Sequence, residues 1–374
     1  MNRNTQPILP NNFKTQWEEL EAEYVAAFRD FGASGWYVMG ESLEAFEADL
    51  AKLSGVKFAV GCASGLDAIE LALRSSGIEA GDKVLTTPLT AFATTLAILR
   101  ANAIPVFADI DASGLVDLDI CDEILQKIPD IKFLIPVHLY GHCLDLEKLK
   151  KLADKHKISI IEDCAQSLLA SFDNTACGSV GIASALSFYP TKNLGCMGDG
   201  GALITDSHKI AECVRKLRDY GQSAKYVHKE VGMNSRLDTL QAVLMHKVHL
   251  PRMKSWTEKR RSIAKCYIDG IANSKITLPV PENTEGSVWH LFPVIIEEDR
   301  DAFIAYMKAA GIVCGIHYPT AIPNQPAMKK IQNIAAPFGF SNAQYFCKHV
   351  VTLPLHPYLR DDEIQKIINS CNKY

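Results

Sequence analysis

Short apolar segments alternate with amphipathic segments over the first two thirds of the chain, and this alternation restricts the fold more than any other feature of the sequence. Apolar runs of this length are typical of buried strands, whereas apolar residues spaced three or four apart are typical of helices. The expected strands are Val84–Pro88, Pro105–Ile110, Phe133–Leu139, Ile158–Glu162, Ala185–Tyr189 and Ala202–Thr205. The expected helices are Leu66–Arg74, Ala93–Arg100, Leu144–Lys155 and Ser207–Asp219. This order predicts an α/β fold with a mostly parallel sheet covered on both faces, and such sheets bind ligands at the carboxyl ends of their strands.

The pattern changes in the last third of the chain. From Leu237 to about Ile271 it is that of a long helix, which Pro251 should kink or break. A strand over Ser287–Ile296 and helices over Arg300–Ala310 and Asp362–Cys371 are expected to follow. A chain of 374 residues is long enough for two domains. We therefore predict a large domain over residues 1–250 and a smaller C-terminal α/β domain over residues 251–374.

The charge of the chain argues against several classes of partner. Its 39 Lys and Arg residues nearly balance its 43 Asp and Glu residues, which gives a formal net charge of −4. Nucleic acid and anionic membranes both select basic surfaces, so we expect neither as a partner. The N-terminal stretch is polar and no apolar run is long enough to cross a bilayer, so we expect a cytoplasmic location.

The eleven cysteines are scattered and include no C-x-x-C pair. Neither a disulfide framework nor a zinc ribbon can be read from this spacing. We therefore expect reduced, partly buried thiols and no metal site.

A lysine and several glycines follow one of the expected strands. The stretch from Ser187 to Gly195 contains Lys192, and Gly198-Asp199-Gly200-Gly201 comes shortly after it. A lysine at the carboxyl edge of a sheet can lose part of its hydration, which lowers the pKa of its amine and makes the amine nucleophilic. The same pattern also fits an ordinary surface lysine.

Two further segments carry polar groups at the ends of expected elements. Asp163 and Gln166 follow the strand Ile158–Glu162. A buried carboxylate there needs a cation, and a protonated pyridine nitrogen is one, although Asp163 could equally be a helix N-cap. Ser64 and Gly65 precede another expected helix, where free N–H groups can hold a phosphate.

These three elements together match the parts of a pyridoxal 5′-phosphate (PLP) site: a lysine amine, an acid for the ring nitrogen and a helix start for the phosphate. The chain resembles the DegT/DnrJ/EryC1 family of sugar aminotransferases, which have the fold-type-I, aspartate aminotransferase-like architecture. Besides the aspartate and lysine motifs, the resemblance is carried by Gly35-Trp36-Tyr37-Val38-Met39-Gly40, Pro105-Val106-Phe107-Ala108-Asp109-Ile110-Asp111, Pro136-Val137-His138-Leu139-Tyr140-Gly141, Asn234-Ser235-Arg236-Leu237-Asp238, His317-Tyr318-Pro319 and Leu353-Pro354-Leu355-His356-Pro357.

The resemblance implies a role for each matching residue. Lys192 would bind the PLP aldehyde covalently and then move a proton on the substrate, while Asp163 would keep the ring nitrogen protonated. Gln166 would hydrogen-bond the phenolic oxygen of the ring. The phosphate would be held by the backbone amides of Ser64, Gly65 and Leu66 and by the hydroxyl of Ser187.

Asn234 resembles the residue that family members donate to the phosphate in the neighbouring subunit. The resemblance thus implies a homodimer in which each active site is built by two chains. The family motif T-[FYW]-x-A-T departs here to Thr90-Ala91-Phe92-Ala93-Thr94. Either Phe92 reaches the cofactor ring along an altered backbone path, or Ala91 faces the ring and Phe92 is a core residue.

The resemblance also implies a substrate class. Members that act on 4-keto sugars commonly read S-F-H-P-x-K, whereas this chain has Tyr189 at the histidine position and looks more like the branch that acts on nucleotide-linked 3-keto-6-deoxyhexoses. The sequence then predicts transfer of an amino group from L-glutamate to a dTDP- or UDP-linked sugar, with PLP cycling through pyridoxamine 5′-phosphate, for a surface polysaccharide or glycoside. The substrate-binding candidates are Tyr37, Tyr189, Lys225, Tyr226, His228, Arg236, His317 and Tyr318.

Three alternatives stay open at this point. The first is the same chemistry on a 4-keto-6-deoxyhexose. The second is a PLP-binding protein without catalysis, although every catalytic position is filled. The third is a nicotinamide-dependent sugar oxidoreductase, for which the spacing from Gly61 to Gly65 does not match the G-x-G-x-x-G turn.

Overall fold

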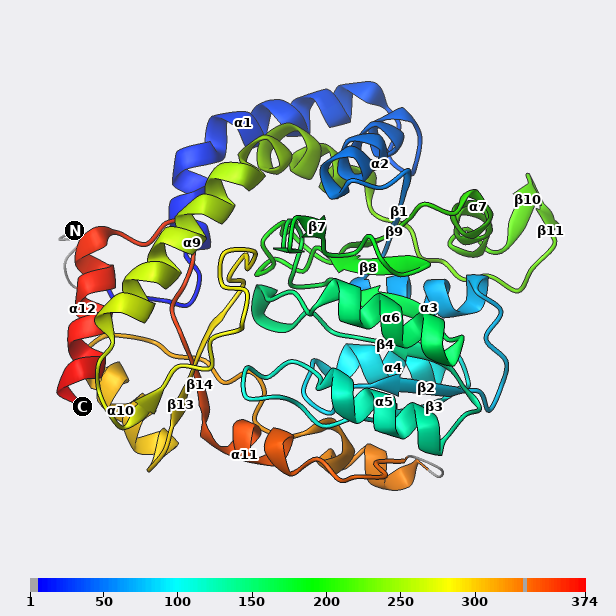
Figure 1. Ribbon diagram of the computed structural model, residues 1–374. Helices are drawn as coiled ribbons and strands as arrows, with labels where there is room; N and C mark the ends of the chain where they lie inside the picture. The colour runs from blue at the N-terminus through cyan, green and yellow to red at the C-terminus, as the bar shows by residue number, and fades with distance from the viewer. Residues whose placement is uncertain (1–5, 332–334) are drawn as a thin grey trace.

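A seven-stranded sheet forms the centre of the computed structural model, which describes residues 6–331 and 335–374 (Figure 1). The strand order is β1-β9-β8-β5-β4-β2-β3. The strands are β1 (Phe58–Cys62), β2 (Lys83–Thr86), β3 (Ile104–Phe107), β4 (Ile131–Ile135), β5 (Ser159–Asp163), β8 (Ala183–Ser187) and β9 (Gly201–Thr205). β9 runs antiparallel to both of its neighbours, and the other pairings are parallel. The predicted α/β class with a mostly parallel sheet is confirmed.

Helices cover both faces of this sheet because each buries an apolar stripe against it. These helices are α2 (Glu41–Ser54), α3 (Gly65–Ser75), α4 (Phe92–Arg100), α5 (Leu118–Lys127), α6 (Leu146–His156), α7 (His208–Leu217) and α8 (Thr239–Leu244). One apolar cluster joins α3, α4 and α7 to the sheet, and a second joins α2, α5, α6 and α8 to it. The longest helix, α1 (Phe13–Ser34), runs along the outside of the molecule from the C-terminal part toward α2 (Figure 1).

The six strands and four helices predicted for the first two thirds are present, with ends that shift by a few residues. The helices α1, α2 and α5 and the strand β1 were not predicted. The strand expected over Ser287–Ile296 is shorter than predicted, since β13 spans Phe292–Ile296. The reason is that the backbone before it is bound elsewhere: Val288 N–H donates to Gly141 O at 2.8 Å, and Ser287 O accepts from Arg261.

The predicted break at Pro251 is confirmed. α8 passes through a wide turn (Met245–His249) and a tight turn (Leu250–Arg252) before α9 (Met253–Gly270) begins. Proline cannot donate the N–H that a regular helix would need at this position, so the hydrogen-bonding pattern changes there.

The C-terminal part contains a second sheet with the strand order β12-β13-β14. Its further elements are β12 (Ile276–Thr277), α10 (Arg300–Ala309), α11 (Ser341–His349), β14 (Val350–Leu353) and α12 (Asp361–Lys373). Ile8 belongs to the apolar cluster of this sheet and forms a bridge with Ile312. The C-terminal part also contacts the large sheet: the N–H of Phe107, the last residue of β3, donates to Ala335 O at 2.8 Å. The C-terminal part is therefore joined to the rest of the chain at two places, and the division at residue 250 stays a prediction.

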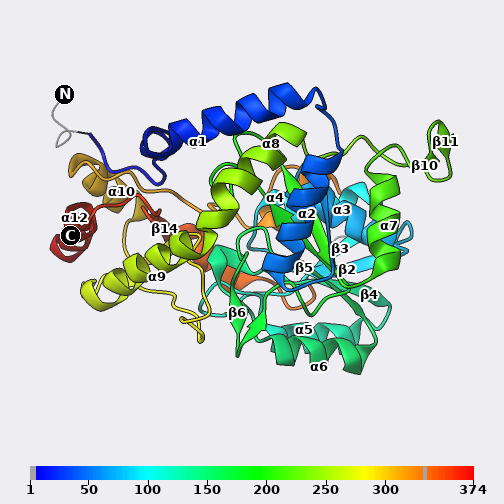
Figure 2. The same cartoon turned by 90° about the horizontal axis from the view of Figure 1, so that it is seen from above.

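A small hairpin projects from the side of the molecule beyond α7 (Figure 2). It consists of β10 (Gln222–Ala224) and β11 (Val227–His228), and its residues are largely exposed. The remaining short elements are β6 (Ser171–Phe172), β7 (Thr175–Ala176) and the single turns Leu139–Gly141, Ile322–Asn324 and Met328–Lys330. Among the described residues, no helix combines the length and apolar character needed to cross a bilayer.

Candidate active site

A cavity of about 560 Å³ opens where β5 and β8 end and α3 begins. The predicted residues that line it are Ser64, Gly65, Leu66, Asp163, Gln166, Ser187, Tyr189, Lys192, His317 and Tyr318. These residues are far apart along the chain, and the parallel strands bring them to one edge of the sheet. The cavity thus lies where the strand pattern predicts a ligand site.

Lys192 lies on a tight loop directly after β8. Its N–H donates to Tyr189 O at 2.8 Å. A side chain at Gly195 would place its Cβ 2.2 Å from Pro190 O, so the loop closes this tightly only with glycine there. Burial lowers the pKa of the Lys192 amine to about 8, against the opposing attraction of the Asp163 carboxylate. An amine with this pKa is largely unprotonated at mildly alkaline pH, as a nucleophile requires.

Asp163 is buried at the end of β5, and both of its carboxylate oxygens are held. Thr94 donates its hydroxyl hydrogen to Oδ2 at 2.8 Å, and the Ala165 N–H donates to Oδ1 at 3.1 Å. The Thr94 hydroxyl also lies 3.1 Å from that of Thr90. These contacts fix the direction of the carboxylate within the cavity. The sequence analysis quoted Thr94 only as part of a motif and did not assign it this contact.

The start of α3 forms a narrow cradle beside Ser187. The Ser64 hydroxyl caps the helix by accepting from Asp67 N–H at 3.1 Å. A Cβ at Gly65 would lie 2.8 Å from the Ser187 Cβ, so only glycine lets the helix start approach this close. Ser235 steadies the same loop, because its hydroxyl donates to Asp67 at 2.7 Å and accepts from Ala63 N–H at 3.1 Å. The free N–H groups at the start of α3, close to the Ser187 side chain, can bind a phosphate group.

Gln166 links the cavity to the C-terminal part of the chain. Its side-chain oxygen accepts from Tyr140 N–H at 2.6 Å, and its amide nitrogen donates to the Tyr318 hydroxyl at 3.2 Å. The neighbouring His317 is held by Thr352, whose hydroxyl lies 2.8 Å from the ring Nδ1. His317 and Tyr318 thus reach the site from the C-terminal part, as predicted.

Phe92 lies outside the cavity, which favours the second of the two alternatives given for the motif Thr90–Thr94. Ala91 lines the cavity, whereas Phe92 packs against the buried cluster of Phe107, Ile322 and Met328. The cause is the start of α4: Ala91 is extended, and Phe92 is the first helical residue. A shift of the aromatic residue by one position therefore turns it away from the cavity and into the core.

Several predicted residues lie outside the cavity of their own chain. Lys225, Tyr226 and His228 belong to the exposed hairpin, and Asn234 is exposed nearby. Tyr37 is exposed after α1. Arg236 is only partly buried, and it pairs with Asp219 at 3.0 Å.

Other residues that line the cavity were missed by the sequence analysis. They include Asn11, Thr90, Asp199 and His290. Asn11 and His290 stand outside any motif, so no local signal marked them. Asp199 and Thr90 belong to motifs that the sequence analysis quoted. Membership of those motifs was the signal that could have identified them as site residues.

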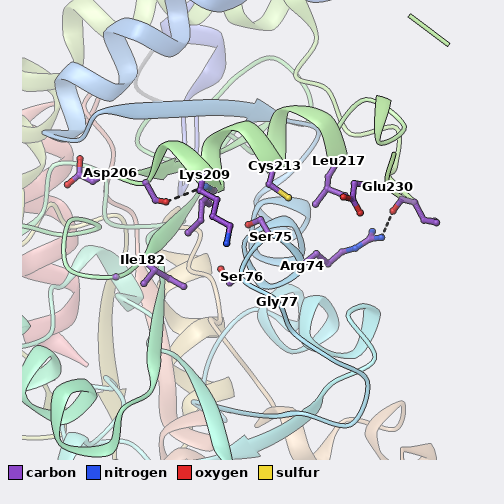
Figure 3. Close-up of a pocket in the computed structure, with 14 residues that line it drawn as sticks. Arg74, Ser75, Ser76, Gly77, Ile182, Asp206, Lys209, Cys213, Leu217 and Glu230 are labelled. Carbon is purple, nitrogen blue, oxygen red and sulfur yellow. Dashed lines mark hydrogen bonds between the residues drawn. The ribbon is translucent and has the colours of Figure 1, made fainter. Parts of the chain in front are cut away.

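A second cavity, of about 950 Å³, lies between the end of α3 and α7 (Figure 3). Arg74 and Lys209 contribute basic groups to it, and Asp206 and Glu230 contribute acidic ones. Arg74 is also held by Val231, whose carbonyl accepts its hydrogen bond at 2.6 Å. None of the predicted site residues, all of which the structure describes, lines this cavity. Size alone therefore does not identify the site, whereas the chemistry of the lining residues does.

The residues of the smaller cavity fit PLP. An amine with a lowered pKa, a fixed carboxylate and a cradle that a single Cβ would fill are the three features that such a cofactor requires.

Several known proteins that are similar to this chain are named as sugar transaminases. The chain is 38% identical to a dTDP-3-amino-3,4,6-trideoxy-alpha-D-glucose transaminase of Streptomyces venezuelae over 97% of this chain and 95% of that protein. It is 37% identical to a dTDP-3-amino-3,6-dideoxy-alpha-D-galactopyranose transaminase of Aneurinibacillus thermoaerophilus, over 91% and 92% of the two chains.

Solved structures agree with the fold. The X-ray crystal structure of S. venezuelae DesV in complex with a ketimine intermediate matches with a TM-score of 0.92 and 38% identity, and the match covers 98% of both chains. NtdA of Bacillus subtilis, with bound cofactor PMP, matches with a TM-score of 0.85 and 26% identity over 94% of this chain and 81% of that one. The model of one protein family matches residues 18–372. Since this match spans nearly the whole chain and includes every residue of the cavity except those at the N-terminal segment, the protein belongs to the DegT/DnrJ/EryC1/StrS aminotransferase family.

Proposed function

We propose that this protein is a PLP-dependent aminotransferase that moves an amino group from L-glutamate to a nucleotide-linked 3-keto-6-deoxyhexose. The observation that supports this proposal most directly is that the Lys192 amine and the Asp163 carboxylate line one cavity beside the start of α3. Glutamate would bind first and leave its amino group behind, and the keto-sugar would then collect it. Two half-reactions at one site predict ping-pong kinetics.

Lys192 is the residue that holds and moves protons. When bound, PLP supplies an electron-accepting ring and carries the amino group between the two substrates. The Lys192 amine, with its pKa lowered to about 8, can take a proton from the substrate carbon and return it to the other end of the conjugated system. Its loop keeps the amine at the carboxyl end of β8 throughout the reaction.

Asp163 sets the charge of the bound ring. Its carboxylate would face the ring nitrogen and hold it protonated, which strengthens the pull on electrons from the substrate carbon. Thr94 and the Ala165 amide keep the carboxylate oriented, so that it need not reorganise during the reaction. Each pKa unit by which Asp163 raises the ring nitrogen corresponds to about 1.36 kcal/mol in favour of the protonated form.

The phosphate would sit at the start of α3. Backbone N–H groups of Ser64, Gly65 and Leu66 and the Ser187 hydroxyl are the proposed donors, and the helix dipole favours the negative charge. Gln166 would direct its amide nitrogen to the phenolic oxygen of the ring instead of to Tyr318.

The 3-keto assignment rests on the names of similar proteins and on Tyr189. The S. venezuelae and A. thermoaerophilus relatives are both named for amino groups at carbon 3. Tyr189 lines the cavity and is 54% exposed, so its side chain is accessible to a sugar ring. The product, an aminated nucleotide sugar made in the cytoplasm, would be a precursor of a surface polysaccharide or a glycoside.

A homodimer with shared sites would explain the predicted residues that lie outside the cavity. Asn234 and the hairpin with Lys225, Tyr226 and His228 would enter the site of the neighbouring subunit, where the basic groups would meet the diphosphate. The exposed apolar residues Trp36, Tyr37, Val38, Tyr226 and Val231 suit an interface of this kind.

The decisive experiment is incubation of the protein and L-glutamate with a panel of 3-keto and 4-keto nucleotide sugars. Mass spectrometry would identify the aminated products, and NMR would locate the new amine. We expect amination at carbon 3 only. Amination of 4-keto sugars would overturn the substrate assignment, and no amine on any sugar would favour a PLP-binding protein without catalysis.

Shared sites can be tested by mixing two inactive variants, Lys192→Ala and Asn234→Ala, under conditions that let subunits exchange. In a mixed dimer one of the two sites would keep both intact residues. We therefore expect recovery of about a quarter of the wild-type activity, because half of the dimers are mixed and half of their sites are intact. No recovery would contradict shared sites.

A further inference from the structure

Three cysteines gather around His138 and Glu162 in the core of the large sheet, outside the active-site cavity. We refer to Cys143, Cys164, Cys177, His138 and Glu162 as the thiol cluster. Cys164 follows β5, Cys177 follows β7, and His138 and Cys143 flank the turn Leu139–Gly141. All five side chains are buried, with exposures of 6% or less. The fold thus assembles a set of metal-binding side chains that the spacing of the cysteines did not indicate.

The atoms of the thiol cluster are as close as metal ligands. One donor atom from each of His138, Glu162, Cys164 and Cys177 lies within 4.8 Å of all the others. Cys143 lies beside this group, since its side chain interacts with those of Cys177 and His138. Zinc holds sulfur at about 2.3 Å and imidazole nitrogen at about 2.0–2.1 Å, so its ligand atoms lie within about 4 Å of one another. Small side-chain rotations would bring four donors to that spacing.

Glu162 is held in place by hydrogen bonds, as expected of a carboxylate that orients a metal-binding histidine. Its Oε1 accepts from the N–H groups of Val180 at 2.9 Å and Gly181 at 2.7 Å, and its Oε2 accepts from Gly178 N–H at 2.8 Å. Oε2 also lies 3.0 Å from His138 Nε2. Its oxygens are therefore already engaged by backbone donors. A carboxylate that holds the far nitrogen of a histidine is the usual second partner of a metal-bound imidazole.

With Nε2–H directed at Glu162, the lone pair of His138 is at Nδ1. At present Nδ1 accepts from Leu144 N–H at 3.2 Å, a long hydrogen bond that a metal could replace.

The glycine at position 178 makes room for one of the sulfurs. Its φ is +90°, and a Cβ there would lie 3.2 Å from Cys164 Sγ. Buried cysteines often serve only as small apolar residues. Here the thiols contact one another and a histidine, and packing alone does not require that combination.

We propose that Cys143, Cys164, Cys177 and His138 bind one zinc ion or a similar thiophilic divalent cation, with Glu162 orienting the histidine. Four protein ligands leave no open position, so the site is structural. Each thiol that binds releases its proton to solvent, and burial implies that the metal enters as the chain folds. The ion would tie the end of β5, which carries Asp163 one residue before Cys164, to the turns that hold His138 and Cys177.

The test measures metal content, so its outcome is independent of whether the proposed aminotransferase reaction is correct. The full-length holoenzyme is produced in medium with added zinc and analysed by elemental mass spectrometry. We expect about one zinc ion per chain in the wild type and at least about a tenfold loss in Cys164→Ala and Cys177→Ala. Cys121→Ala is the matched control, because Cys121 is equally buried but lies in α5, outside the thiol cluster. It should keep its zinc.

X-ray absorption at the zinc edge of the wild-type protein gives a second measurement that does not depend on any variant. We expect a first shell of about three sulfurs and one nitrogen. The proposal is overturned by wild-type protein with less than about a tenth of an ion per chain, by a shell of oxygen and nitrogen alone, or by zinc that stays in both cluster variants. Equal loss of zinc from Cys121→Ala would overturn it as well.

Discussion

The contact between Thr94 and Asp163 shows how a single hydroxyl can control the charge at the site. Thr94 lies at the start of α4 and donates to the buried carboxylate at 2.8 Å. A hydrogen bond to a charged group contributes about 1.5–3 kcal/mol, more than most neutral ones. The direction of the carboxylate therefore depends on a residue of another element, α4, as well as on the strand that carries Asp163.

We predict that Thr94→Val lowers turnover by about tenfold or more, because one carboxylate oxygen loses its donor and the carboxylate is less well oriented. The cofactor absorbance should stay close to that of the wild type. Steady-state kinetics with glutamate checks this, and Thr94→Ser, which keeps the hydroxyl, is the control. Equal turnover in Thr94→Val and the wild type would show that Asp163 is held well enough by Ala165 alone.

Phe92 leads to the opposite prediction, since it contacts the core and not the cavity. Phe92→Leu should lower the free energy of unfolding by about 1 kcal/mol, because a half-buried ring loses part of its contacts. The affinity for PLP and the KM values should not change. Urea unfolding measures the first effect and a cofactor titration measures the second. A clear loss of PLP affinity would indicate that Phe92 contacts the cofactor.

At this scale, the sequence analysis identified residues whose chemistry is recognisable by type and motif. Lys192, Asp163 and Ser187 all line the cavity. It could not decide between Ala91 and Phe92, because a shift of one position depends on where α4 begins. It also missed His290, whose position results from packing between distant segments.

At the scale of elements, the start of α3 is the part most sensitive to volume. We predict that Gly65→Ala weakens PLP binding by about tenfold or more, because the added Cβ would lie 2.8 Å from the Ser187 Cβ and push the helix start away. Equilibrium titration with PLP measures the effect. Gly32→Ala is the control, because Gly32 has nothing within 4 Å of its Cβ position. An unchanged affinity in Gly65→Ala would mean that the cradle can widen at no cost.

The prediction of elements succeeded where the periodicity was strong and failed where it was mixed. The parallel strands β2 to β5 and β8 are mostly buried and centred on short apolar segments, so they stand out in the sequence. β1 (Phe58–Cys62) includes Gly61 and lies at the edge of the sheet, and it was missed. α1 was missed because its apolar residues are spread over a largely exposed surface.

At the scale of the whole molecule, buried histidines lie where separate segments meet. His249 donates its Nδ1–H to Gly195 O at 2.8 Å, and its Nε2 accepts from the Tyr24 hydroxyl of α1 at 2.7 Å. His142 lies 3.0 Å from Ser287. Burial lowers the pKa of His142 and of His356 to about 3, and that of His249 to about 4.

These shifts predict that the protein loses stability in mild acid. The three histidines are neutral in the folded state, whereas in the unfolded chain they take up protons below a pKa of about 6.5. Their contribution is therefore complete above that pH and is lost as the pH falls toward the folded values. These three histidines together contribute a fall of about 4 kcal/mol in the free energy of unfolding between pH 7.5 and 5.5. Urea unfolding at the two pH values measures this fall.

A variant separates the histidines from other titrating groups. His356→Asn should reduce the fall by about 1.4 kcal/mol, because one buried neutral histidine no longer titrates in the unfolded chain. Stability that is independent of pH over this range, in the wild type, would contradict the buried neutral state.

Long-range organisation was the least predictable scale. The mostly parallel sheet follows from the alternation, but the order of its strands and the joining of the N-terminal segment to the C-terminal sheet do not. Ile8 pairs with Ile312 because both complete one apolar cluster, and nothing in the sequence near Ile8 indicates its partner. The hairpin of β10 and β11 was not predicted as an element either, although three of its residues, Lys225, Tyr226 and His228, were candidates for substrate binding.

The contact of Ile8 with the C-terminal sheet has a consequence for how the connectivity of the chain can be changed. Ile8 and Cys371 of the last helix belong to the same apolar cluster, so segments near both ends of the described chain pack in one core. A circular permutant could join the original ends through a short linker and open instead within the exposed hairpin, where few contacts would be cut. Folding would then start from a different end of the chain while every layer kept its neighbours.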